Sequence, residues 1–140
     1  DVNRIMQHPF TSVASDGRLT KMGEGHPHPR NYGTFVRILD KYVRQDSVLT
    51  LPEAIRKMTS LPADRMGLTD RGLIREGYQA DITIFDPTTV RDNADWDEGK
   101  NSLPSTGIPY VIVNGTIVVK DSKVLEGVYP GQPIRNAVLD

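Results

Sequence analysis

The 140-residue sequence contains no cysteine, which excludes disulfide scaffolds, thiolate zinc sites and cysteine nucleophiles. It also lacks long apolar runs, because its longest apolar stretches fall well short of the roughly 20 residues that cross a bilayer. Runs of one charge are missing too, since 17 Lys and Arg are interspersed with 18 Asp and Glu. We therefore expect a soluble, cytoplasmic protein without a visible targeting signal, with neither nucleic acid nor membrane as a partner.

Up to about Gly67, the patterns of apolar residues predict mainly helices. Residues 2–7 have the helical period and end at His8-Pro9, because a residue before proline disfavours the helical conformation. The clearest amphipathic stripe lies in residues 32–44. Its apolar members are Phe35, Ile38, Leu39, Tyr42 and Val43.

A capping box marks the start of the next predicted helix. The Thr50 hydroxyl can accept a hydrogen bond from the Glu53 amide, and Pro52 fits the first turn. This helix extends to about Thr59 and is expected to bury Ala54, Ile55 and Met58. A further short helix over residues 63–66 is expected to close at Gly67.

After Gly72 the sequence predicts short strands. Residues 81–86 carry β-branched and apolar side chains, and residues 110–113 and 116–119 are joined by Asn114-Gly115, the strongest short-range signal of a hairpin. A turn at residues 121–123 makes a three-stranded meander. Residues 91–108 are polar, with Trp96 as their main expected apolar anchor.

Residues 10–15 read as a brief buried strand that ends at Asp16-Gly17. A carboxylate at such a strand end can ligate a metal and transfer a proton, although Asp-Gly is more often a simple turn. Downstream, His26 and His28 resemble a zinc-binding pair and Arg30 can bind a carboxylate with two parallel hydrogen bonds. Ordered or solvated loop roles remain open for all three residues.

Several segments, in order, together resemble the amidohydrolase superfamily, and most closely its D-aminoacylase branch. Residues 15–17 (SDG) look like its strand-8 motif, and residues 28–35 (HPRNYGTF) look like the distinctive segment that follows. Residues 49–63 are similar to the helix pair after the barrel. Residues 77–86 are similar to the return strand of the superfamily, and residues 113–115 to its closing hairpin.

The resemblance implies an α+β fragment of a larger enzyme. Residues 1–67 would be the end of a TIM-like (β/α)8 barrel, with strand 8, helix 8 and the following helices. Residues 68–140 would be the C-terminal part of a small β-sandwich. The parent would be a zinc-dependent hydrolase that cleaves N-acyl-D-amino acids to a carboxylate and a D-amino acid. Carried over by position, Asp16 would be both metal ligand and catalytic base, and Arg30 would bind the substrate α-carboxylate.

The other metal ligands of this family have no counterpart in the sequence. They are a His-x-His pair on strand 1, a cysteine and two later histidines, whereas the only histidines here are His8, His26 and His28. We therefore expect the missing strands to lie upstream and the isolated chain to be inactive, without bound zinc. We also consider that such a fragment can associate with itself through the exposed surfaces that would face the barrel.

Two alternatives to a D-aminoacylase parent stay open. The first is an amidohydrolase acting on cyclic amides, similar to hydantoinase or dihydroorotase, which the HPRNYGTF segment disfavours. The second is a non-catalytic β-domain or assembly module. The missing ligands favour this module for the chain as such, whereas Asp16 and Arg30 favour an enzyme parent.

Overall fold

A computed structural model of the chain describes residues 1–21 and 23–134. The helices are α1 (Val2–Gln7), α2 (Arg30–Arg37), the π-helix η1 (Ile38–Gln45), α3 (Leu51–Met58) and α4 (Ser60–Arg65). The strands are β1 (Ile82–Ile84), β2 (Tyr110–Val113), β3 (Thr116–Lys120) and β4 (Lys123–Val124). The predicted second unit, residues 68–140, extends beyond the described residues at 135–140.

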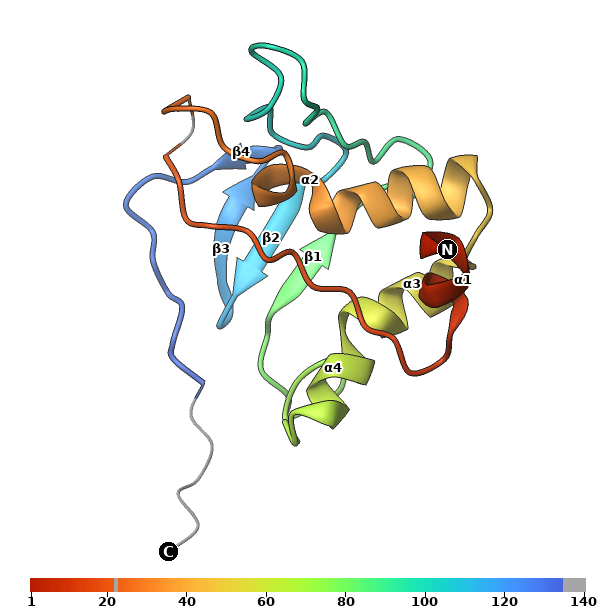
Figure 1. Ribbon diagram of the computed structural model, residues 1–140. Helices are drawn as coiled ribbons and strands as arrows, with labels where there is room; N and C mark the ends of the chain where they lie inside the picture. The colour runs from red at the N-terminus through yellow and green to blue at the C-terminus, as the bar shows by residue number, and fades with distance from the viewer. Residues whose placement is uncertain (22, 135–140) are drawn as a thin grey trace, which may run out of the picture.

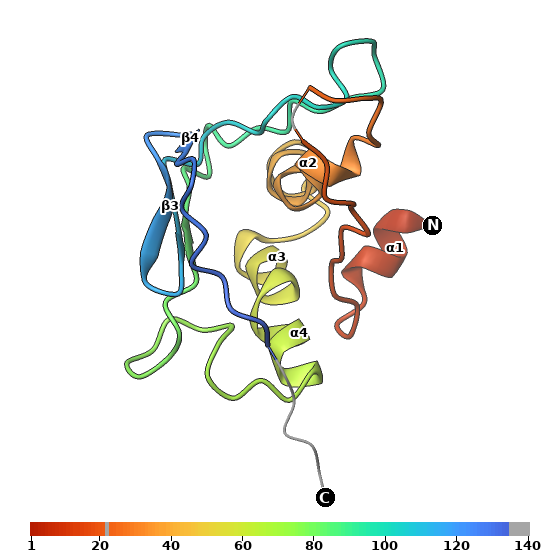
Figure 2. The same cartoon turned by 90° about the vertical axis from the view of Figure 1, so that its left-hand side faces the viewer.

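The helices and the sheet lie side by side in an α+β arrangement (Figure 1). Figure 2 shows α2, α3 and α4 between the sheet on one side and α1 on the other. The sheet has four antiparallel strands in the order β1-β2-β3-β4, so the predicted meander is confirmed and β1 extends it. Among the residues that the structure describes, no helix has the length and apolar content needed to cross a lipid bilayer.

The amphipathic stripe forms one continuous helical rod from α2 through η1. Ile38 and Leu39 are buried as expected, whereas Phe35 is exposed and Val36 is buried instead. The reason is the wider turn of η1, which changes the residues that share a face with the α2 segment. Tyr42 and Val43 pack against the buried cluster from its edge.

The capping box at the start of α3 is confirmed, because the Thr50 hydroxyl accepts a hydrogen bond from the Glu53 amide at 3.4 Å. The buried face of α3 differs from the expectation. Ala54 is fully buried, but Ile55 is exposed and the charged Lys57 is fully buried in the last turn. A prediction that places only apolar residues on the buried face of α3 therefore misses Lys57, the most buried long side chain of this helix.

Phe10 lies in a turn and residues 11–15 pair with no strand in the described chain, so the expected buried strand is not formed. Phe10 is largely exposed. The segment is held by α3 instead, since the Val13 N–H donates to the carbonyl of Lys57 at 3.1 Å. The physical reason is the absence of a neighbouring strand among the described residues to supply a ladder of backbone hydrogen bonds.

The hairpin between β2 and β3 turns at Asn114 and Gly115, both of which have positive φ, as predicted. The polar segment 91–108 follows the surface. A β-bridge between Arg91 and Thr106 joins its two ends. Trp96 is not its anchor, because 72% of its surface is exposed. Ala94 is buried instead, next to the buried Val90 at the start of the segment.

A buried carboxylate joins the helical layer to this segment. The side chain of Asp40 accepts hydrogen bonds from Arg44, from Gln45 at 2.7 Å and from the Asp92 N–H at 3.0 Å. Arg44 in turn donates to the Val90 carbonyl at 2.6 Å. Asp40 thus fixes η1 to residues that lie about fifty positions later in the chain.

Replacing Asp40 by alanine is expected to lower the free energy of unfolding by about 3 kcal/mol, because Arg44 loses its buried partner and the Asp92 N–H loses its acceptor. The control is Asp46→Ala, which removes a half-exposed carboxylate from the surface pair with Lys41. That change should cost less than about 1 kcal/mol. Thermal unfolding of the intact protein measures both, and equal decreases in Tm would contradict a special role for Asp40.

Candidate functional site

Asp16 lies in a tight turn that presses against the start of α2. Its backbone is left-handed, with φ of 49°, a conformation that aspartate tolerates better than most residues. A Cβ at Gly17 would lie 3.2 Å from the Cα of Asn31, a tight contact that favours glycine at this position. The Arg18 N–H donates to the Asn31 side chain at 3.1 Å and fixes the turn in place.

Arg30, the first residue of α2, faces this turn. Its Nη2 lies 2.9 Å from Oδ2 of Asp16, so the structure brings the two predicted site residues together. The Asp16 side chain is 85% exposed and that of Arg30 is 40% exposed. An ion pair this open to solvent contributes less than about 1 kcal/mol, and an incoming anion can therefore replace Asp16 on the guanidinium.

The guanidinium of Arg30 retains an unused donor. Its Nε is buried and has no hydrogen-bond partner among the described residues. Leaving a buried donor unsatisfied costs about 1–3 kcal/mol, so an acceptor that reached the Nε–H after a local rearrangement would be stabilised. Because Nε and Nη lie in one plane, the side chain can bind both oxygens of a carboxylate.

His26 and His28 do not form a metal pair with Asp16. The Nδ1 of His28 accepts a hydrogen bond from the Arg30 N–H at 3.0 Å, and its ring lies edge-on to Trp96 with centroids 4.4 Å apart. The Nδ1 of His26 lies 3.2 Å from the side-chain nitrogen of Asn101. Both imidazoles therefore order the loop that leads to Arg30.

The segment over residues 92–105 supports that same loop and the start of α2. Buried Asn101 donates to the Pro27 carbonyl at 3.2 Å, and the Ser105 hydroxyl donates to the Tyr32 carbonyl at 3.3 Å. The carboxylate of Asp92 packs on Gly33 in α2. The sequence analysis did not identify these supporting residues. The one signal in the sequence is Gly33, because a glycine inside a helix indicates a close contact.

The segment that leads to Asp16 is held by Lys57, which bonds to His8, Thr11 and Val13. Burial lowers the pKa of the Lys57 ammonium, and the nearby Glu53 carboxylate partly opposes that decrease. The spacing of Ala54, Lys57 and Met58 at i, i+3 and i+4 is the signal that places Lys57 on the inner face of α3.

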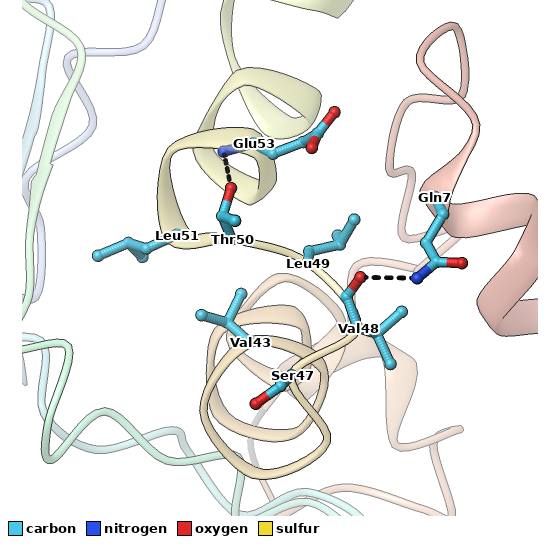
Figure 3. A pocket seen from close by; sticks show the side chains of 8 residues that line it. All are labelled: Gln7, Val43, Ser47, Val48, Leu49, Thr50, Leu51 and Glu53. Atoms are coloured by element: carbon cyan, nitrogen blue, oxygen red, sulfur yellow. Dashed lines mark hydrogen bonds between the residues drawn. The ribbon is translucent and has the colours of Figure 1, made fainter.

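The hollow drawn in Figure 3 lies away from this site, at the junction of α1, η1 and α3. Gln7 bridges it by donating to the Val48 carbonyl at 3.2 Å. The capping pair of Thr50 and Glu53 forms one side and Val43 another. Glu53 is the one titratable residue in its lining, so the hollow lacks the second titratable group or metal ligand that a catalytic pair would need.

A metal ion at Asp16 would need ligands that the described residues do not provide. No group of three or more His, Cys, Asp or Glu side chains in the described ranges is close enough to hold an ion. A zinc site takes about four ligands, three or more of them from protein. The exposed carboxylate of Asp16 fits the role of one oxygen ligand in a site completed by other residues.

The Amidohydrolase family matches residues 1–119 of the chain. An N-acyl-D-glutamate deacylase of Alcaligenes xylosoxydans xylosoxydans is 48% identical over 118 residues, which cover 84% of this chain and 23% of that protein. A dihydroorotase of Lactobacillus acidophilus is 32% identical over 93 residues, which cover 60% of this chain and 22% of that protein. The chain thus spans about a quarter of the length of the relatives it matches.

Solved structures agree with the sequence relatives. The crystal structure of D-aminoacylase superimposes with a TM-score of 0.83 at 38% identity, over 93% of this chain and 26% of that one. The N-acyl-D-glutamate deacylase of Bordetella bronchiseptica, complexed with zinc and a phosphonate inhibitor, gives a TM-score of 0.85 at 42% identity, over 96% of this chain and 27% of that one.

Replacing Gly33 by alanine is expected to displace the start of α2, because the new Cβ would lie 2.1 Å from Oδ1 of Asp92. Overpacking of this kind typically costs about 1–3 kcal/mol. The control is Gly131→Ala, since a Cβ at Gly131 meets no atom within 4 Å. Thermal unfolding of the intact protein should show a lower Tm for Gly33→Ala alone, and an unchanged Tm would contradict the close contact.

Proposed function

This chain belongs to the amidohydrolase family, and on that premise we propose that the intact protein hydrolyses N-acyl-D-amino acids to a carboxylate and a free D-amino acid. The observation that carries the proposal is the 2.9 Å approach of Arg30 to Asp16, which puts a carboxylate-binding group beside a candidate base. The deacylase relatives support the substrate class, since an N-acyl-D-aspartate deacylase is also 49% identical over 118 residues.

Asp16 is the proposed metal ligand and catalytic base. In the intact protein, zinc held by Asp16 and by residues outside these 140 would polarise the attacking water and lower its pKa. The Asp16 carboxylate then takes a proton from that water and returns it to the departing amine. Its exposed position in a turn fixed by Arg18 and Asn31 leaves both oxygens accessible for these roles.

Arg30 is the proposed site for the substrate α-carboxylate. The part-exposed guanidinium holds its donors in one plane, which suits a planar carboxylate better than a lysine ammonium does. The substrate carboxylate replaces Asp16 on the guanidinium. That exchange places the scissile amide next to the base, so binding and proton transfer are coupled in one small site.

The place of this chain in the whole protein is also a proposal. We assign residues 1–67 to the end of a TIM-like barrel, with residues 10–15 as strand 8, and residues 68–140 to part of a small β-sandwich. The exposed apolar side chains of Phe10 and Leu19 support a covering by other parts of the protein. Several statements about the isolated chain stay predictions. We expect it to be inactive, to bind no zinc, to be capable of self-association and to be cytoplasmic.

A dihydroorotase-like activity on a cyclic amide is the rival enzyme function. The dihydroorotase of Lactobacillus acidophilus shares less identity and covers a smaller part of this chain than the deacylases do. Arg30 does not separate the two substrates, because dihydroorotate also carries a carboxylate. The higher identity and coverage of the deacylases favour a linear N-acyl amino acid.

Replacing Asp16 by asparagine is expected to lower kcat by several orders of magnitude and leave KM nearly unchanged, because the proton transfer is lost while Arg30 still binds substrate. Steady-state kinetics of the intact, zinc-loaded protein measure this split. Asp97→Asn, in an exposed loop, is the control and should behave as wild type. An Asp16→Asn variant within about tenfold of the wild-type turnover would remove Asp16 from the mechanism.

Replacing Arg30 by methionine is expected to cost about 1.5–3 kcal/mol in kcat/KM, the usual range for a hydrogen bond to a charged group. Arg30→Lys should recover only part of this loss, because lysine cannot bind both oxygens in one plane. The loss should shrink for the corresponding N-acyl-D-amino acid amide, which has no carboxylate to bind. Equal losses for the acid and the amide would show that Arg30 only supports the loop.

A further inference from the structure

Lys57 makes an unusual set of contacts for a charged residue. It is fully buried in the last turn of α3, and its Nζ donates to the carbonyls of His8 and of Thr11, the latter at 3.1 Å. Its own carbonyl accepts the Val13 N–H at 3.1 Å. One residue therefore binds the segment after α1 at three residues, His8, Thr11 and Val13.

Packing alone does not account for a lysine here. Burying an ammonium costs several kcal/mol unless hydrogen bonds compensate, whereas an apolar side chain would fill the same space without that penalty. No carboxylate lies within salt-bridge distance of Lys57 in the described part of the chain. The compensation comes from the carbonyls of His8 and Thr11, to which the ammonium donates.

The segment that Lys57 holds leads directly to Asp16. Val13 precedes Asp16 by only three positions, so the anchored backbone fixes where the turn starts. Arg30 is anchored by a separate set of contacts, in which Asn101 and Ser105 bind the loop and the first turn of α2. A change at Lys57 therefore acts on the Asp16 side of the site first.

We propose that Lys57 is a positioning residue for Asp16: its ammonium binds the carbonyls of His8 and Thr11 and so sets the place of the Asp16 carboxylate. This inference rests on the proposed function, because it concerns the base of that same reaction. Lys57 touches neither substrate nor reacting atoms. It acts through the backbone that carries Asp16, and a displacement of about 1 Å at such a group can cost 100-fold in rate.

The test uses the intact, zinc-loaded protein with Lys57→Met, which keeps the length of the side chain and removes its donors. Expected results are a kcat lower by about 10- to 100-fold and a KM within about threefold of wild type. Amide hydrogen exchange should become faster in peptides covering residues 8–18 and stay unchanged in the β2–β3 hairpin. Lys41→Met, which removes a half-exposed ammonium from η1, is the matched control and should change neither readout.

Three outcomes overturn the inference. One is a Lys57→Met variant with wild-type kcat, and another is a kcat loss accompanied by faster exchange in the hairpin as well, which shows general destabilisation. If Lys57→Met does not fold, Lys57→Gln decides, because its shorter amide cannot span both carbonyls. A lowered kcat at unchanged KM then supports the inference, and a wild-type kcat is the third outcome against it. A wild-type protein inactive on N-acyl-D-amino acids would instead refute the proposed function, while the exchange data would still report on the anchoring.

Discussion

The segment that leads from α1 to Asp16 is anchored on α3, and Lys57 supplies the central contacts. Its buried ammonium binds the carbonyls of His8 and Thr11, and Arg56 adds a bond to the Pro9 carbonyl at 2.7 Å. Without its bonds, the buried ammonium of Lys57 would be unsatisfied at a cost of several kcal/mol, so the positions of Lys57 and of the segment depend on each other. The course of the chain toward Asp16 depends on this anchoring.

The opposite side of the site depends on a second polar cluster. Asp40 ties η1 to the backbone at Asp92, whose own buried carboxylate lies 3.3 Å from Arg37 and packs on Gly33. These contacts set the position of α2 and hence of Arg30, its first residue. The buried cation Lys57 therefore fixes the position of Asp16, and the buried anion Asp40 fixes that of Arg30. The exposed ion pair between Asp16 and Arg30 is solvated and is free to exchange partners.

Local chemistry explains what the sequence predicts well. The Thr50 cap and the Asn114-Gly115 turn require only neighbours in sequence, so both are readable without a structure. The hydrogen bonds of Lys57 to His8 and of Asp92 to Asp40 join residues 49 and 52 positions apart, and no local pattern encodes such partners. The failed strand over residues 10–15 has the same origin, because a strand exists only where another strand pairs with it. The proximity of Asp16 and Arg30 matches the resemblance, whereas their chemical roles stay predictions.

Family membership and the paired site together make hydrolysis of N-acyl-D-amino acids the central claim, although the chain spans only about a quarter of its relatives. The most direct test compares kcat/KM of the intact, zinc-loaded protein for the two enantiomers of N-acetylglutamate. The account predicts hydrolysis of the D-enantiomer with a preference of about 100-fold or more over the L-enantiomer. Hydrolysis of neither enantiomer, together with ring opening of dihydroorotate, would contradict it.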